Sequence, residues 1–294
     1  RFLILAFNGF EDHIHDGHGP GRLVREIYAD HSWGPIHVFK LNDIYDSADL
    51  GYPYYTESSD SGFVEACSQL YADKAFYQQL YEEHRDGTFP ITESGDFTCQ
   101  AISFHHRSDS TMVGHFKSGW AALSYDEGAS WTTPVETNVT LSSAKTWVQQ
   151  TEDGKSALIH SGRYASQRFP LMMETGSDGA LYSDAVVIHG EVPPLRYDGG
   201  VKKSGPQYVR GICEGNGNPP GDDMWLSYSA GKEDIWVCSV PVPVTKSWTG
   251  STDDDFDNMT VGGSVENWNI YDGKWFDAEV AVRTRDANTA NHAL

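Results

Sequence analysis

A short motif near the middle of the chain places the strongest constraint on its fold. Ser124, Asp126, Gly128 and Trp131 match the Asp-box pattern S-x-D-x-G-x-x-W at every fixed position. In such a motif the carboxylate accepts backbone N–H groups, the glycine takes a positive φ and the tryptophan packs under the turn. The motif therefore predicts a tight turn between two β-strands.

Weaker copies of this motif recur along the chain. One lies 52 residues on, at Asp178, with Tyr182 replacing the tryptophan, and another lies a further 52 residues on, at Ala230, with Trp236 beyond it. A period of about 50 residues is the size of one four-stranded propeller blade, so 294 residues make five to six blades. We expect an all-β fold, a β-propeller of six or seven blades of which part lies outside this chain.

The predicted propeller occupies residues 1–247, and residues 248–294 form a C-terminal segment that completes it or starts a further β element. A short helical insertion interrupts the β pattern around residues 60–86. There, apolar residues from Phe63 to Tyr81 recur at roughly helical spacing, after the N-cap candidates Ser59, Asp60 and Ser61.

The charge of the chain excludes some partners. The net charge of −21 argues against nucleic acid and against an anionic membrane, and no apolar run is long enough to span a bilayer. Between Lys145 and Arg210, however, eight basic and seven acidic residues leave a net charge of +1. We expect an anionic substrate to bind in this region, and we expect the protein to be a monomer.

The cysteines and sequons indicate a secreted protein. None of the four cysteines forms a C-x-x-C pair, so a zinc ribbon is not expected. The sequons at Asn138 and Asn258 predict glycosylation, and Cys213 and Cys238 are the candidate disulfide pair. The chain begins with an apolar strand and no Met, which predicts a mature or cropped chain without a signal peptide.

Four runs of the sequence carry a resemblance to a known group of enzymes. They read GHFKSGWAALSYDEGASW, HGEVPPLRYDG, SGPQYVRGICEGNG and SYSAGKEDIWVCSVPVPV. The span 114–243 thereby resembles the β-propeller L-rhamnose-α-1,4-D-glucuronate lyases of polysaccharide lyase family 42 and the related α-L-rhamnosidases of glycoside hydrolase family 145. The residues Ser-Ala-Gly before Lys232 depart from the more polar run expected there.

The resemblance implies a secreted exo-type lyase that releases L-rhamnose from rhamnosyl-glucuronate ends of an acidic plant polysaccharide, such as the arabinogalactan of gum arabic. Such β-elimination needs a base for the C5 proton and a cation that neutralises the carboxylate. The alternatives are an α-L-rhamnosidase, a sialidase-like hydrolase or a non-catalytic carbohydrate-binding propeller. No cofactor is required, although the many carbonyl groups and acids are compatible with a structural calcium ion on the axis.

An arginine suits the cationic role because its guanidinium binds a carboxylate through two N–H groups. Arg210 is the first choice, since it lies in a strand-like run, and Arg196 and Arg107 follow. Candidates for contact with the rest of the substrate are basic or amide side chains. They are Arg107, Lys117, Lys145, Gln207, Asn216, Lys232 and Arg22.

A histidine suits the role of base because it is neutral near pH 7 without any tuning. His105 and His115 are the preferred candidates, with His106 and Tyr208 as alternatives. A tyrosine would need a nearby arginine to lower its pKa. A hydrolase would instead use two carboxylates. As the alternative for a hydrolase, the resemblance implies a histidine on the opposite propeller face. The candidates are Glu191, Glu214, Asp222 and Asp223 for the former, and His13, His15 and His18, also possible metal ligands, for the latter.

Overall fold

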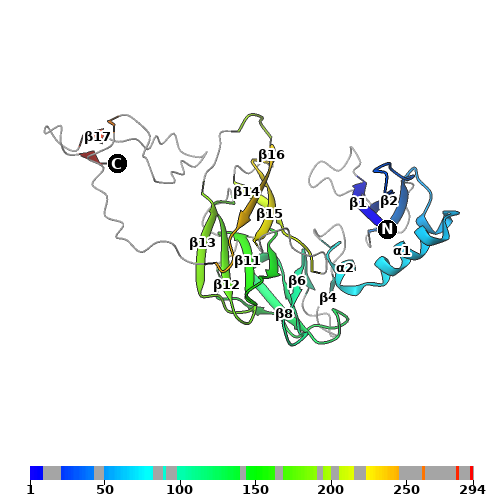
Figure 1. Ribbon diagram of the computed structural model, residues 1–294, viewed down its shortest axis with the longest axis horizontal. Helices are drawn as coiled ribbons and strands as arrows, with labels where there is room; N and C mark the ends of the chain where they lie inside the picture. The colour runs from blue at the N-terminus through cyan, green and yellow to red at the C-terminus, as the bar shows by residue number, and fades with distance from the viewer. Residues whose placement is uncertain are drawn as a thin grey trace.

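A computed structural model describes the backbone of residues 1–8, 21–42, 50–81, 89–90, 98–139, 144–162, 168–190, 195–199, 205–214, 223–244, 260–261, 283–284 and 292–293. Antiparallel β-sheets dominate the fold, as expected (Figure 1). Two sheets have four strands each, in sequence order. One contains β6 (Ser103–His106), β7 (Met112–His115), β8 (Trp120–Ser124) and β9 (Val135–Glu136). The other contains β10 (Trp147–Gln150), β11 (Ser156–Ser161), β12 (Leu171–Gly176) and β13 (Asp184–His189).

A third sheet continues this arrangement with three described strands. They are β14 (Pro206–Arg210), β15 (Met224–Ala230) and β16 (Asp234–Val240). The first strand of each sheet lies against the sheet before it: Ser103 Oγ accepts from Val148 N at 2.8 Å, and Ser161 Oγ donates to Pro206 O at 3.2 Å. The described chain from β10 to β16 is therefore a run of strands in sequence order, in keeping with the expected all-β fold.

Because the strands run up and down in order, their connections alternate between two ends of the sheets. We call one the Asp-box end. It carries the turns after β6, β8, β10, β12 and β14. We call the other the cationic end, because Lys145, Arg168 and Lys232 gather there. It carries the connections after β7, β9, β11, β13 and β15.

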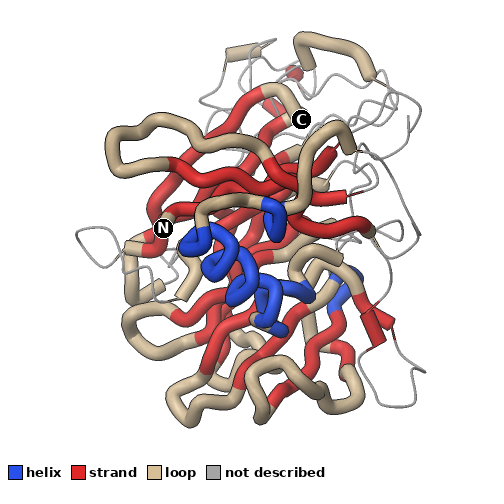
Figure 2. Tube along the Cα trace, turned by 90° about the vertical axis from the view of Figure 1, so that its right-hand side faces the viewer, coloured by secondary structure: helices blue, strands red, loops and turns tan. Residues whose placement is uncertain are grey.

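The N-terminal part of the chain forms a separate three-stranded sheet beside the predicted helical insertion. The sheet contains β1 (Phe2–Asn8), β2 (Gly21–Ile27) and β3 (His37–Leu41). The insertion contains η1 (Tyr55–Glu57), α1 (Ser61–Ala72) and α2 (Lys74–Gln78). Asp60 caps α1 as predicted, by accepting from Phe63 N at 3.0 Å, and Asp73 caps α2 in the same way. Strands lie on both sides of these helices in Figure 2.

Short two-stranded ladders complete the described elements. They are β4 (Phe89–Pro90) with β5 (Thr98–Cys99), and β17 (Arg283–Thr284) with β18 (His292–Ala293). η3 (Lys117–Gly119) occupies the turn between β7 and β8. Most of the predicted C-terminal segment 248–294 lies outside the described residues.

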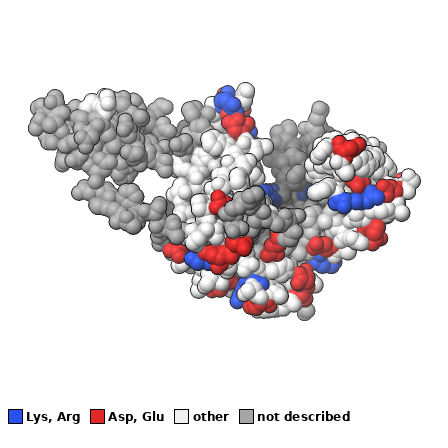
Figure 3. All heavy atoms as spheres, in the orientation of Figure 1, with Lys and Arg blue, Asp and Glu red and all other residues white. Residues whose placement is uncertain are grey.

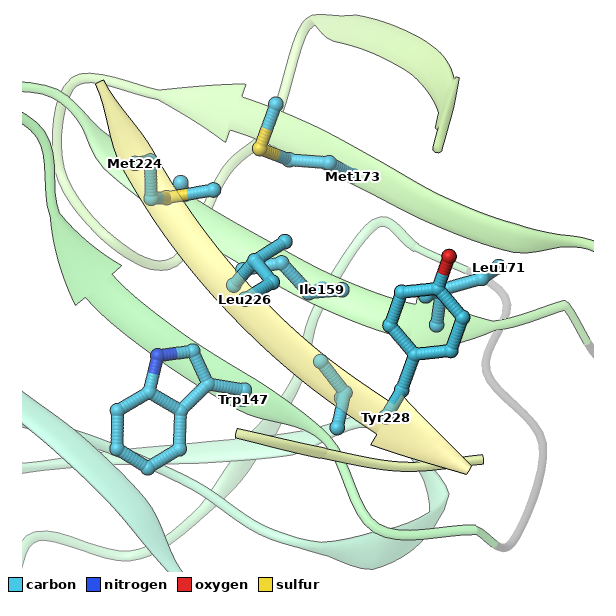
Figure 4. Close-up of a cluster of buried hydrophobic side chains, with 9 residues drawn as sticks. Trp147, Ile159, Leu171, Met173, Met224, Leu226 and Tyr228 are labelled. Atoms are coloured by element: carbon cyan, nitrogen blue, oxygen red, sulfur yellow. The ribbon is translucent and has the colours of Figure 1, made fainter. Parts of the chain in front are cut away.

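The main hydrophobic core joins the sheet β10–β13 to the sheet β14–β16. Ile159, Leu171 and Met173 meet Leu226 and Tyr228 across this interface, all 4% exposed or less (Figure 4). Burial of large apolar side chains of this kind contributes roughly 1.5–3 kcal/mol for each. The sheets are thus held face to face, which fixes the relative positions of the loops at each end.

The Asp-box adopts the predicted geometry. Asp126 Oδ1 accepts from Ser130 N at 2.8 Å, and Gly128 has a φ of 78°. Trp131 is 7% exposed and donates from Nε1 to Gln78 of α2 at 2.8 Å. The motif therefore closes the turn between β8 and β9 and also anchors the helical insertion to this sheet.

The second copy is confirmed and the third is wrong. Asp178 accepts from Leu181 N at 2.7 Å in the turn between β12 and β13, which is again a turn between third and fourth strands. Ala230, in contrast, precedes the turn between β15 and β16, which are the second and third strands of their sheet. The 52-residue step therefore ends at a different strand junction, because the connection into β14 is longer than the one into β10.

The predicted disulfide is also wrong. Cys213 and Cys238 are both free thiols. Cys238 lies in the body of β16, where it is hydrogen bonded to Tyr228, whereas Cys213 follows the end of β14 on the Asp-box side. β15 lies between β14 and β16, so the two cysteines are not carried by adjacent strands.

Candidate functional site

Three cationic side chains surround one tyrosine at the cationic end. The ring centroid of Tyr208 lies 5.2 Å from Arg168 Cζ, 5.6 Å from Lys232 Nζ and 5.8 Å from Lys145 Nζ. Each cation comes from a different connection: Lys145 precedes β10, Arg168 precedes β12 and Lys232 lies between β15 and β16. Residues that are distant in the sequence thus converge because their loops share one end of the sheets.

The backbone of this cluster is strained. Arg168, Tyr208 and Lys232 have φ values of 62°, 57° and 56°, in the left-handed region that disfavours residues other than glycine. Tyr208 also lies at an irregularity of β14, where the register with β15 shifts between Gln207 and Arg210. Such residues cost of order 1–3 kcal/mol each and gather at functional sites. A bulge can re-aim a side chain in the same way.

The cations change the acidity of Tyr208. Burial would raise its pKa, but the charges and hydrogen bonds of Arg168 and Lys232 outweigh burial and place the pKa of Tyr208 below the ordinary value. The residue is still 39% exposed, so a ligand can reach its side chain. Gln207, which is 1% exposed, accepts from Arg168 Nη1 at 2.8 Å and so fixes the guanidinium beside the ring.

The predicted substrate-binding residues Lys145, Gln207 and Lys232 therefore meet the alternative base Tyr208. Arg168 completes the cluster, and the sequence marks it only as one of the basic residues of the span 145–210, not as a site residue. Its signal in the sequence is its position in the span 145–210, where basic residues outnumber acidic ones by eight to seven.

The preferred bases His105 and His115 lie elsewhere, buried between the sheets β6–β9 and β10–β13. They are 1% and 0% exposed. Burial lowers the pKa of both, that of His115 to about 4. His115 Nε2 lies 2.7 Å from Gly179 O and 2.8 Å from Tyr182 Oη, contacts that hold the second Asp-box turn against β7.

The other predicted arginines make contacts with residues other than Tyr208. Arg210 Cζ is 5.7 Å from the Trp147 ring, and Arg196 forms ion pairs with Glu233 and Asp234 at 3.2 and 2.7 Å. Arg107 pairs with Asp109 at 3.4 Å in the turn after β6, at the opposite end. Arg22 is buried beside α2, where it donates to Leu80 O at 2.7 Å. Lys117 begins the turn between β7 and β8.

A different group of titratable residues lies at the Asp-box end. His106 Nδ1 and Nε2 lie 2.6 Å from Glu214 and 3.0 Å from Glu127, respectively. Partial burial opposes protonation of His106, but the two carboxylates outweigh it and raise its pKa. Glu214, one of the predicted acids, thus ties the loop after β14 to the end of β6.

The remaining predicted residues are placed as follows. Asn138 exchanges two hydrogen bonds with the backbone of Tyr182, so its amide is engaged in the fold. Asp223 directly precedes β15. The predicted residues that lie outside the described part of the chain are His13, His15, His18, Glu191, Asn216, Asp222 and Asn258.

The described residues offer neither a metal-binding cluster nor a membrane-spanning helix. Within them, no three His, Cys, Asp or Glu side chains are grouped so that they could hold a metal ion. Among the described helices, none is long and apolar enough to cross a membrane. Acidic and basic side chains are interspersed on the face shown in Figure 3.

Comparisons with known proteins agree with the fold. Residues 1–95 match a family model described as BT_1020-like, N-terminal beta propeller. A solved structure named sialidase matches with 33% sequence identity and a TM-score of 0.68, over 91% of this chain and 24% of that one. No curated protein matches the chain. The chain is thus an all-β protein of the β-propeller type, is similar to a sialidase, and spans about a quarter of the length of that relative.

Proposed function

We propose that the chain carries the active site of a carbohydrate-active propeller enzyme that cleaves an acidic glycan by β-elimination. One observation carries the proposal: Tyr208 is exposed, lies among three cations and is held on a strained backbone with two of them. A cationic group is needed for a uronate, and a tyrosine with a lowered pKa is suited to proton abstraction.

In the proposed reaction the carboxylate of glucuronate binds Arg168, supported by Lys145. Neutralising that carboxylate makes the proton on C5 more acidic, because the negative charge that develops on its loss is shared with the carboxylate. The phenolate oxygen of Tyr208 takes this proton, and the electrons of the broken C5–H bond form the C4=C5 double bond. The C4–O4 bond breaks, and O4 leaves with rhamnose after receiving a proton from Tyr208 or Lys232.

The substrate class follows from this chemistry and from the resemblance to rhamnose-glucuronate lyases. We infer that the natural substrate is an acidic plant polysaccharide with rhamnosyl-glucuronate ends, and that the enzyme is secreted and acts as a monomer. The base is assigned here to Tyr208 and the neutralising cation to Arg168, in place of the histidines and Arg210 expected from the sequence.

A glycoside hydrolase is the second candidate, because the matching solved structure is named a sialidase. Sialidases use a tyrosine as nucleophile, and the same cations that lower the pKa of Tyr208 would favour that role. The hydrolase would attack the anomeric carbon through the phenol oxygen and give a product without a double bond.

A product assay separates these functions. The full chain is incubated with gum arabic oligosaccharides and with a rhamnose-capped glucuronide, and the unsaturated uronate is followed by its far-UV absorbance. Free rhamnose together with this absorbance supports the lyase. Free sugar without absorbance supports the hydrolase, and the absence of both products contradicts an enzymatic function. Tyr208→Phe is the control that ties any product to the proposed site.

A further inference from the structure

A second exposed tyrosine lies at the same end of the sheets as the proposed site. Tyr197 is 67% exposed and belongs to the connection between β13 and β14 at the cationic end. Arg196 Cζ lies 5.9 Å from its ring centroid. A large aromatic side chain with this exposure can stack on the C–H face of a sugar, provided that its backbone is held in place.

The backbone of Tyr197 is held by Glu233. The carboxylate accepts from Tyr197 N at 2.9 Å and from Arg196 N at 2.9 and 3.0 Å, and its side chain is only 5% exposed. Arg196 adds contacts to Glu233 at 3.2 Å and to Asp234 at 2.7 Å. Charge-assisted hydrogen bonds of this number fix the segment with more strength than neutral ones would.

The same turn presents Lys232 to Tyr208. Lys232 directly precedes Glu233, and its Nζ lies 5.6 Å from the Tyr208 ring. Glu233 thus ties the segment of Tyr197 to the turn that supplies one cation of the site. The backbone of Tyr197 is thus held beside the turn that carries Lys232, and its exposed ring is placed to contact a sugar beyond the one that is cleaved.

We propose that Tyr197 forms a second sugar subsite, with Glu233 as its positioning residue. This proposal rests on the proposed function. The ligand is an acidic oligosaccharide that continues past the terminal disaccharide. Arg196 is then part of the support of this subsite, where its pairing with two acidic side chains is useful. The consequence is a preference for longer substrates that the cations around Tyr208 alone do not give.

Binding by length tests the proposal. The dissociation constants of a rhamnose-capped glucuronide disaccharide and of a longer acidic arabinogalactan oligosaccharide with the same cap are measured by titration calorimetry. We expect Tyr197→Ala to weaken the longer ligand about tenfold and the disaccharide little, because one stacking contact is lost. Tyr197→Phe keeps the ring and should retain most of the affinity. Tyr125→Ala, at a tyrosine that is 73% exposed in the Asp-box turn, is the matched control.

Glu233 is tested by its coupling to Tyr197. Glu233→Gln should weaken the longer ligand, and in the Tyr197→Ala background it should add nothing, which a general loss of fold would not reproduce. Equal loss for both ligands, an unchanged Kd in Tyr197→Ala, or no gain with length in the wild type would each overturn the proposal. Length-dependent binding without any product would instead refute the proposed activity and leave the subsite standing.

Discussion

The exposed cluster around Tyr208 and the buried histidines His105 and His115 place titratable groups in opposite surroundings. Tyr208 is 39% exposed and has cations on several sides, whereas the two histidines are 1% and 0% exposed between two sheets. Burial disfavours the charged form in both places. At Tyr208 the cations reverse its effect, whereas at His115 burial dominates and the pKa falls to about 4.

This difference separates a reactive group from a structural one. Burial favours the neutral form of both histidines, and His115 joins neighbouring sheets through Gly179 and Tyr182. At Tyr208 the fold accepts an unfavourable backbone conformation and a concentration of like charges, neither of which helps folding. A binding or catalytic role accounts for keeping both.

The largest expected effect is the loss of kcat on substitution of the exposed residue Tyr208. Tyr208→Phe removes the proposed base and retains the ring, so kcat should fall about 10²–10⁴-fold while the fold is kept. The rate is measured by the appearance of unsaturated uronate, with circular dichroism as the check on folding. A variant with wild-type kcat would show that the cationic cluster binds without catalysing.

The burial of His115 predicts that the stability of the fold depends on pH. The pKa of His115 is about 4 in the folded chain and about 6.5 when unfolded, so the unfolded state binds more protons between these values. The contribution of His115 to the free energy of unfolding is therefore complete above pH 6.5. It is lost as the pH falls towards 4, and the total loss is about 3 kcal/mol.

Urea unfolding midpoints at pH 7, 6, 5 and 4 measure this loss. His115→Gln should be less stable at pH 7 but should show a shallower decline, since glutamine does not take up a proton. Parallel curves for the two proteins would argue that carboxylates elsewhere cause the acid sensitivity and that the histidine contributes nothing to it.

The sequence predicted repeating elements better than it predicted the site. The strands, the helix cap at Asp60 and the first two Asp-box turns follow from local patterns. The spacing of apolar residues, the turn residues and the capping residues all act on residues close to them in the sequence. The third repeat failed because loop lengths vary between blades, as the connection before β14 shows. Blade number is likewise a property of the closed ring and not of one blade.

The site depended on information that local patterns lack. His105 and His115 were favoured for their intrinsic pKa, yet which face of a strand is buried between sheets is decided by the neighbouring sheet. Arg168 was missed because its partners, Gln207 and Tyr208, are about 40 residues away and meet it only through the shared end of the sheets. A tyrosine base needs a nearby arginine to lower its pKa, and the arginine beside Tyr208 is Arg168.

Substitution of Arg168 and of Arg210 tests which of the two neutralises the carboxylate of the substrate. Arg168→Ala should lower kcat/KM by about 10- to 100-fold, the loss of one charge-assisted contact to a carboxylate, and should raise the pH at which activity appears. The sign follows because Arg168 lowers the pKa of Tyr208, so its removal raises that pKa. Arg210→Ala, at the arginine beside Trp147, should have a smaller effect and leave the pH profile in place. The reverse order of effects would return the neutralising role to Arg210.

The smallest expected effect lies at the Asp-box end, where a polar network is structural only. Ser124 is 1% exposed, donates to Asp126 at 2.9 Å and accepts from Gly128 N at 2.9 Å. Ser124→Ala should therefore lower the free energy of unfolding by about 1 kcal/mol, the usual value of a lost hydrogen bond. The kcat should not change, because the turn lies at the end of the sheets opposite Tyr208. Thermal or urea unfolding and the product assay are carried out on one preparation. A lower kcat in a variant that is fully folded would mean that the Asp-box end and the cationic end are coupled.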